Sequence, residues 1–390
     1  MKTFEEAYRI VMEHVAVFPT ERVNMMDCLG RILAEDIHSD TDMPPFNKSA
    51  VDGFACRAAD LNRDLEVIET IPAGKLPEFR VTEGKCSRIM TGASLPDGSD
   101  CVVMVEDTQI LENGMMRSNG KPASLNVCYK GEDIKAGDVV LPKGTLIKPQ
   151  HIAVLATAGD VTPKVSKHVH VGILSTGDEL VEPEHLPSPS KIRNTNAYQL
   201  IAQVKNTGAI PNYGGIASDT EISLSAMLSD SLDINNIVLL TGGVSMGDFD
   251  YVPRAMEYLD IKILFKSIAI QPGKPTVFGK RGDQFIFGLP GNPVSSFVLY
   301  EVLVKPFLLR TMGCQEEPLI IRLPMGISFT RKKSSRKLLI PVRIENGLVF
   351  PVEYHGSAHI NAYTEANGMI AIDTGKTELV KGEMTDVRFL

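Results

Sequence analysis

The chain lacks tryptophan, and aromatic residues make up only 6% of its 390 residues. It also lacks any run of about 18 uninterrupted apolar residues, so no membrane-spanning helix is expected. Its first ten residues, MKTFEEAYRI, carry charges where a secretory signal needs an apolar run. The expected location is therefore cytoplasmic, with no membrane partner.

The chain has no excess of basic residues and no paired cysteine motif. The formal net charge of −8 argues against a nucleic-acid partner, which would need a basic face. A small anion is still compatible with this charge, because local backbone amides can hold it. The six cysteines are scattered without a C-x-x-C or a histidine at zinc-ligand spacing, so reduced thiols are expected.

The length and the residue patterns indicate several domains. Residues 37–131 alternate short β-like runs with Gly, Pro, Asn and Asp, which predicts an all-β unit. From residue 168, apolar strands alternate with helical patterns, which predicts a doubly wound α/β sheet. From about residue 315 the pattern becomes β-like again. The expected fold class is therefore multidomain, α/β and β.

Three loops of the predicted α/β domain are unusual, and each follows an apolar strand. They read LSTGDEL (174–180), LTGGVSMGDFDY (240–251) and GLPGNPVSSF (288–297). In an open α/β sheet, ligands bind beyond the carboxyl ends of the strands. The candidate ligand-binding residues in these loops are Thr176, Gly177, Asp178, Gly242, Gly243, Ser245, Gly247, Asp248, Pro290, Gly291, Asn292 and Pro293.

The glycines suggest a close approach between the backbone and a ligand, since glycine allows sharp turns. Successive amides ahead of a helix can cradle an anion. Asp248 and Asp250 would repel a bare phosphate, but they suit a hard cation such as Mg2+ or donors on the ligand. Each loop taken alone can equally be a structural turn. Their occurrence at three strand ends of one domain favours a site.

Two stretches upstream of the α/β domain also contain polar candidate site residues. MPPFNKSAVDGFACR (43–57) contains Asp52 beside a glycine, and RIMTGASLPDGSDCVVMVED (88–107) contains Thr91. A β-turn with a polar edge explains each of them without any function.

Taken together, these segments resemble the molybdopterin molybdotransferase family, which includes MoeA and the E domain of gephyrin. Five blocks carry the resemblance in order along nearly the whole chain. They are PPFNKSAVDGFACRAAD, RIMTGASLPDGSDCVVMVEDT, KGEDIKAGDVVLPKGTLI, the three strand-end loops with SDTE and QPGKP, and HGSAHINAYTEANGMIAI.

The resemblance implies four domains and an elongated homodimer. The implied divisions are a discontinuous N-terminal domain (1–36 and 132–167), an inserted β-domain (37–131), an α/β molybdopterin-binding domain (168–312) and a C-terminal β-barrel (313–390). The active site would lie between the α/β domain of one subunit and the β-domain of the other, which would explain the distant Asp52 and Thr91.

The implied reaction inserts molybdenum from molybdate into adenylylated molybdopterin and releases AMP, with Mg2+ as cofactor. A MogA-type adenylyltransferase and apo-molybdoenzymes are the implied protein partners. Asp219 and Asp250 would hold the metal, while Glu179 and Asp133 would orient ligand or water. The matching catalytic positions are Asp52, Thr91, Asp133, Glu179, Asp219 and Asp250, and Lys274, Pro290, Pro293 and Ser357 join the ligand-binding set.

The chain departs from the family pattern where positive charge is usual. Cys128, Ser267 and Gln271 stand at positions that are often basic, and Asn47 stands where aspartate is usual. An alternative is therefore a non-catalytic molybdopterin-binding or assembly protein with a degraded basic site. A stand-alone adenylyltransferase would leave the flanking domains unexplained. The metal handled, molybdenum or tungsten, stays open.

Overall fold

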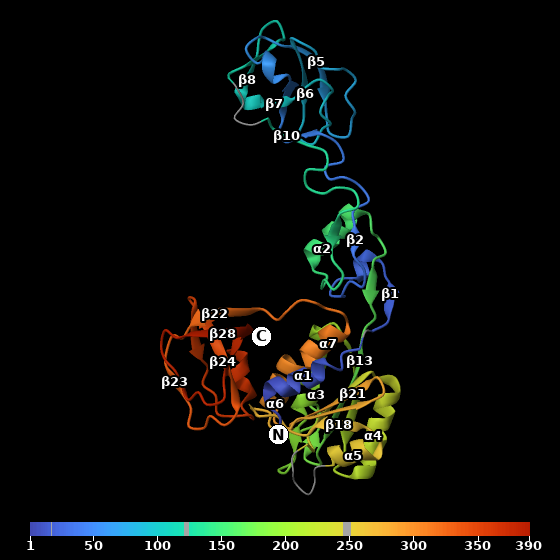
Figure 1. Ribbon diagram of the computed structural model, residues 1–390, viewed down its shortest axis with the longest axis vertical. Helices are drawn as coiled ribbons and strands as arrows, with labels where there is room; N and C mark the ends of the chain where they lie inside the picture. The colour runs from blue at the N-terminus through green and yellow to red at the C-terminus, as the bar shows by residue number, and fades with distance from the viewer. Residues whose placement is uncertain (17, 121–124, 245–250) are drawn as a thin grey trace.

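The structure, a computed structural model, describes residues 1–16, 18–120, 125–244 and 251–390. Figure 1 shows an elongated molecule with a β-module at one end, a narrower middle unit, a central α/β domain, and a C-terminal β-sheet beside that domain. Within the described ranges, no helix is long and apolar enough to cross a membrane. The expected multidomain architecture of α/β and β parts is confirmed.

The α/β domain is built on one six-stranded sheet. In spatial order its strands are β16 (Ile210–Ala217), β13 (His170–Thr176), β17 (Ile237–Thr241), β21 (Gln284–Leu289), β20 (Val277–Arg281) and β18 (Lys262–Phe265). The first four run parallel, and β20 is antiparallel to both of its neighbours. The carboxyl ends of the parallel strands therefore share one edge, and the three candidate loops leave from it.

Helices cover both faces of this sheet, as a doubly wound fold requires (Figure 1). One face packs against α1 (Phe4–Met12), α3 (Thr195–Asn206), α6 (Pro293–Leu299) and α7 (Lys305–Thr311), and the other against α4 (Glu221–Ile234) and α5 (Val252–Tyr258). Helix α1 begins with a capping box of Thr3 and Glu6. Ala7 and Val11 of α1 lie in the α/β core, although the sequence analysis grouped this helix with the N-terminal domain.

The closing helix of the α/β domain is interrupted next to Pro306. A π-helical turn, Tyr300–Val304, separates α6 from α7. Proline has no N–H to donate to the carbonyl four residues earlier, so regular α-helical bonding cannot continue through it.

The middle unit contains two small β-ladders and one helix. They are β1 (Thr20–Arg22) with β12 (Lys164–Ser166), β2 (Ile37–His38) with β11 (Val139–Leu141), and α2 (Pro149–Ala158). A separate apolar core fills this unit, drawn from residues on both sides of the inserted β-module. The chain therefore passes through the middle unit twice.

The β-module is all-β, as its sequence predicts. Its main sheet has the order β5 (Glu66–Ile71), β6 (Lys85–Ile89), β4 (Gly53–Cys56) and β7 (Cys101–Met104). Two further pairs are β3 (Lys48–Ser49) with β10 (Val127–Cys128) and β8 (Thr108–Ile110) with β9 (Met116–Ser118).

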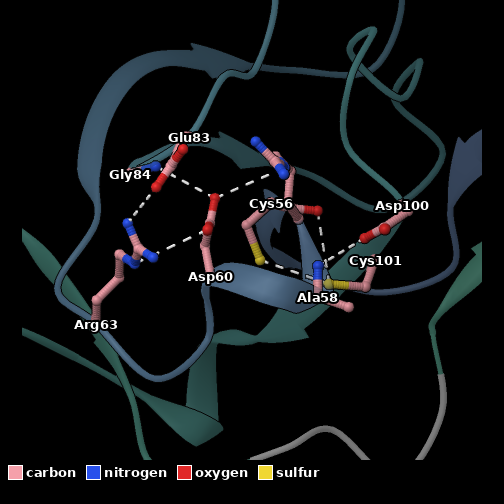
Figure 2. A network of polar contacts seen from close by, with 9 residues as sticks. Cys56, Ala58, Asp60, Arg63, Glu83, Gly84, Asp100 and Cys101 are labelled. Carbon is pink, nitrogen blue, oxygen red and sulfur yellow. Dashed lines mark hydrogen bonds and ion pairs between the residues drawn. The ribbon is translucent and has the colours of Figure 1, made fainter.

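A buried carboxylate fixes one side of the β-module (Figure 2). Asp60 is 2% exposed, and its carboxylate accepts from the Gly84 amide (3.2 Å) and lies 3.8 Å from the Arg63 guanidinium. Arg63 also binds Glu83 at 2.8 Å. Because a buried charge needs partners, this network ties the segment after β4 to the start of β6.

The C-terminal sheet curls back on itself. Its order is β19 (Ile270–Gln271), β24 (Lys337–Glu345), β26 (Gly368–Ile372), β28 (Met384–Phe389) and β22 (Ile320–Pro324), with β25 (Leu348–Pro351) also on β24 and a separate pair of β23 (Phe329–Thr330) and β27 (Glu378–Leu379). One bridge, Met325 to Val349, joins the end of β22 to β25. This bridge brings the two ends of the path β25–β24–β26–β28–β22 together, and the closed β-barrel stays a prediction.

The segment IKILFKSIAI links the α/β domain to this sheet. The sequence predicts one strand there, but the chain forms β18 and then β19, which pairs with β24 instead. Strand β19 therefore belongs to the C-terminal sheet.

The aromatic core of the α/β domain generates a stability prediction. Phe278 is fully buried, and its ring centroid lies 4.7 to 6.2 Å from those of Phe265, Phe285, Phe287 and Phe307. Phe278→Ala should lower the free energy of unfolding by about 3–5 kcal/mol, because it leaves a cavity. Urea denaturation followed by circular dichroism measures this change. The control Phe79→Ala removes a ring that is 54% exposed and should change stability by less than about 0.5 kcal/mol.

Candidate active site

The strand-end loops of the α/β domain enclose a pocket of about 290 Å3. It lies where β13, β17 and β21 end, at the edge of the sheet where the sequence places a site. Its lining consists of Thr176, Gly177, Glu179, Leu180, Ile192, Asn196, Asp219, Thr241, Gly242, Gly243 and Gly291. All three predicted loops therefore contribute to one cavity.

Gly242 allows the loops to meet at close range. Its φ is 91°, and a Cβ there would lie 2.4 Å from the carbonyl oxygen of Thr176. The Gly242 amide donates to Leu289 at 3.1 Å, and a Cβ on Gly291 would lie 3.6 Å from the Gly242 Cα. The sequence predicts that these glycines let a ligand approach the backbone closely. At Gly242 the close neighbour is instead the backbone of another loop of the protein.

Asp178 and Asp219 bind each other's backbone and close one side of the pocket. Asp219 Oδ1 accepts from the Thr176 hydroxyl at 2.8 Å, and its Oδ2 accepts from the Asp178 amide at 3.2 Å. The Asp219 amide donates to Asp178 Oδ1 at 3.2 Å. Asp219 lines the pocket, whereas Asp178 braces the loop and is not part of the lining.

Glu179 is the second carboxylate at the pocket, and its residue is exposed. It is held by the short parallel pair β14 (Leu180–Val181) and β15 (Ile192–Arg193), in which the Ile192 amide donates to the Glu179 carbonyl at 2.8 Å. Of the acids predicted at this edge of the sheet, Glu179 and Asp219 therefore reach one cavity.

The third loop joins the start of α6 to the C-terminal part of the chain. The Val294 amide donates to the Ser357 carbonyl at 3.1 Å, which brings Ser357 against the Pro293 end of the helix. Asn292 is the N-cap residue, and its carbonyl accepts from the amides of Ser295 and Ser296. Pro290 is buried, and Pro290, Asn292, Pro293 and Ser357 shape the loop without lining the pocket.

Lys274 has an exposed side chain and is likewise outside the pocket lining. Its carbonyl accepts from the Ile268 and Thr276 amides, so its backbone closes a turn. Ser245, Gly247, Asp248 and Asp250 fall outside the described residues.

Asp52 and Thr91 form a contact of their own in the β-module. Asp52 Oδ1 accepts from the Thr91 amide at 2.6 Å and from its hydroxyl at 2.7 Å. These bonds, first the amide and then the hydroxyl, hold the pKa of the Asp52 carboxyl below its usual range. Figure 1 places the β-module at the opposite end of the molecule from the α/β domain, so one chain does not bring this pair to the pocket.

Asp133 lies in the segment that returns from the β-module to the middle unit. Its amide donates to the Met43 carbonyl at 3.0 Å, and its residue is exposed. It joins neither the pocket nor the Asp52 contact within the chain.

The sequence analysis missed Asn196 and Thr241, which line the pocket. Thr241 belongs to a series of buried hydrogen bonds. Its hydroxyl donates to the Ser175 hydroxyl, which in turn donates to Asn194 Oδ1 at 2.9 Å. Asn194 in turn donates to the Tyr213 hydroxyl. Burial raises the pKa of Tyr213, and the neighbouring Glu182 raises it further. The polar run RNTNAY (193–198) predicts the start of a helix, and nothing in it singles out Asn196.

The described residues hold no group of three or more His, Cys, Asp or Glu arranged to bind a metal. Asp250 was expected to hold metal with Asp219, and it falls outside them. The predicted metal pair therefore stays a prediction.

Comparison with known proteins gives matches along almost the whole chain. Residues 2–159 match the MoeA N-terminal region (domain I and II), residues 172–310 match a probable molybdopterin binding domain, and residues 322–390 match the MoeA C-terminal region (domain IV).

Individual relatives agree with these matches. Proteins named molybdopterin molybdenumtransferase from Staphylococcus epidermidis and Bacillus subtilis are each 35% identical over 98% of this chain, which spans 94% and 93% of their lengths. The crystal structure of the molybdopterin biosynthesis MoeA protein from Pyrococcus horikoshii superimposes with a TM-score of 0.87 at 29% identity, over the full length of both chains. The chain belongs to the MoeA family of molybdopterin molybdenumtransferases.

Proposed function

We propose that this chain inserts molybdenum from molybdate into adenylylated molybdopterin and releases AMP. The observation that carries the proposal is one pocket at the carboxyl edge of the sheet that receives three loops and presents the carboxylates of Glu179 and Asp219. The family supports molybdopterin and molybdate as the substrates. In this reaction water attacks the phosphoanhydride and AMP leaves. The two dithiolene thiols bind molybdenum, and their two protons leave with one molybdate oxygen as water.

The acids of this edge suit Mg2+. Magnesium is usually bound through one or two carboxylates together with substrate phosphates, and Asp219 already has a fixed orientation from Thr176 and Asp178. We assign Asp219 and Asp250 to hold Mg2+, which would neutralise charge on the phosphates when bound. The Gly243 backbone lines the same pocket and would lie beside these phosphates. Asp248, outside the described residues, stays a predicted ligand-binding residue.

Glu179 suits the role of orienting water or a substrate oxygen. The residue is exposed and lines the pocket, so its carboxylate can accept a proton at the reacting oxygen. Asp133 would play a similar part from the segment beside the β-module. The third loop would be held in position by Pro290, Asn292, Pro293 and Ser357. Lys274 would add positive charge to the site.

The site is proposed to be shared between two subunits of a homodimer. Asp52 and Thr91 form an ordered contact, yet the β-module lies far from the pocket of its own chain (Figure 1). A second copy could place its β-module at this pocket. In this arrangement one subunit contributes its α/β domain (168–312) and the other its β-domain (37–131). The remaining divisions are the N-terminal domain (1–36 and 132–167), whose helix α1 docks on the α/β domain, and the C-terminal domain (313–390).

The alternative, a binding protein without turnover, rests on the lost basic residues. One neighbour offsets part of that loss, since the Arg336 guanidinium donates to the Ile270 carbonyl at 3.4 Å, directly beside Gln271. Positive charge thus remains beside Gln271. An adenylyltransferase would have to supply the adenylylated substrate, and an apo-molybdoenzyme would receive the product.

Removal of one pocket carboxylate tests the proposed reaction. Asp219→Ala should lower the rate of AMP release from adenylylated molybdopterin, with molybdate and Mg2+ present, by about 100-fold or more. The matched control Asp233→Ala removes an exposed acid from the same segment of chain, at the far end of α4, and should keep the wild-type rate. Equal rates for wild type and Asp219→Ala would show that this pocket is not the reaction site.

A mixed dimer tests the shared site. Asp52→Ala and Asp219→Ala, each inactive alone, should recover about one quarter of wild-type AMP release when co-expressed. Random pairing makes half of the dimers mixed, and each mixed dimer then has one intact site of two. Co-expression of Asp219→Ala with Glu179→Ala should recover nothing, because both changes lie in the same pocket. Activity of the first mixture no higher than that of its parents would exclude the shared arrangement.

A further inference from the structure

The segment that carries Glu179 has little backbone support of its own. It comprises residues 177–194, between β13 and α3, and we call it the strap. Within it, β14 and β15 form a parallel ladder of two residue pairs. A ladder this short is marginal by itself, so the position of Glu179 depends on side-chain contacts between the strap and the rest of the domain.

Glu182 makes such contacts with two tyrosines. Its Oε1 accepts from the Tyr213 hydroxyl of β16 at 2.7 Å, and its Oε2 accepts from the Tyr198 hydroxyl of α3 at 3.0 Å. The centroids of the two rings are 5.8 Å apart. Glu182 is half-buried and follows Glu179 by three residues. Its carboxylate therefore attaches the strap both to the edge strand of the sheet and to a helix on one face.

The direction of these hydrogen bonds follows from the start of α3. Asn194 is the N-cap residue, and its side-chain oxygen accepts from the Ala197 amide, so its Nδ2 faces Tyr213. The Tyr213 oxygen accepts from this Nδ2 at 2.9 Å, which leaves its proton for Glu182. A carboxylate can only accept, so the donors and the acceptor match.

Both tyrosine protons stay in place at neutral pH. The hydrogen bond to Glu182 raises the pKa of the Tyr198 hydroxyl. Burial, and then the hydrogen bond to Glu182, raise the pKa of the Tyr213 hydroxyl. Loss of a tyrosine proton therefore does not loosen these contacts around neutral pH.

We propose that Glu182, held by the hydroxyls of Tyr198 and Tyr213, is a positioning residue for Glu179. This inference rests on the proposed function, in which Glu179 orients water or a substrate oxygen at the pocket. It goes beyond that function, because it assigns the placement of Glu179 to three residues that do not line the pocket.

Removal of single contacts tests the positioning. Tyr213→Phe, which keeps the ring, and Glu182→Ala should each lower the kcat of AMP release roughly 10-fold or more and leave KM within about 2-fold. The reason is that a displaced catalytic group weakens transition-state stabilisation more than substrate binding. Initial rates over a range of adenylylated molybdopterin concentrations, with molybdate and Mg2+ present, give both constants.

Rescue by a conservative change separates positioning from loss of the fold. Glu182→Gln keeps an oxygen for the Tyr213 hydroxyl and an N–H that the Tyr198 oxygen can accept, so it should retain most of the wild-type kcat. The matched control Glu184→Ala removes an exposed acid two residues further along the strap and should keep the wild-type rate. Circular dichroism checks that each variant is folded.

A double-mutant cycle shows whether the contacts act through Glu179. Glu179→Ala alone should lower the rate, and adding Tyr213→Phe to it should cause no further loss, because the group that is positioned is already absent. A loss by the same factor in both backgrounds would mean that Tyr213 supports the domain independently of Glu179, and it would overturn the inference.

The other outcomes separate this inference from the proposed function. Wild-type kcat in both Tyr213→Phe and Glu182→Ala overturns the positioning role and leaves the proposed function intact. Folded Glu182→Gln that is as slow as Glu182→Ala also overturns it, because the contacts and not the charge are proposed to hold the strap. Absence of AMP release from the wild-type protein overturns the proposed function and this inference together.

Discussion

The contact between Gly242 and the carbonyl of Thr176 is the constraint on which the rest of the site depends. A Cβ at Gly242 would lie 2.4 Å from that oxygen, so any side chain there would push the loops after β13 and β17 apart. The same segment receives the third loop through the bond from Gly242 to Leu289. Because these backbones touch, the pocket residues from three separate strands occupy fixed positions.

The hydrogen bonds between Asp178 and Asp219 also fix the positions of the carboxylates at the pocket. Each aspartate accepts from the other's amide, and Thr176 adds a hydroxyl to Asp219. The Asp219 carboxylate is thus oriented before any ligand arrives, which reduces the rearrangement that cation binding would require. Asp178 acts from outside the cavity lining, so the two adjacent acids of GDEL have different positions: Asp178 supports the loop, and Glu179 lines the pocket.

The sequence predicted the doubly wound sheet well, because VHVGILST and NIVLLT have the continuous apolar character of strands buried on both faces. The strand-end loops could be located for the same reason. Asn196 could not be found, since nothing in RNTNAY distinguishes a helix cap from a side chain that reaches Gly291, 95 residues later. The pairing of β19 with β24 and the docking of α1 on the α/β core were missed for a similar reason, as both depend on contacts distant in sequence.

The pocket brings carboxylates and main-chain groups together at one edge of the sheet. Asp219 and Glu179 line it together with the backbones of Gly243 and Gly291. A carboxylate can hold a hard cation, and a cation at Asp219 would compensate the charge of a phosphate that lies against these glycines. Because Thr176 and Asp178 fix the orientation of Asp219, the position of that cation would follow from the same contacts that hold the loops together.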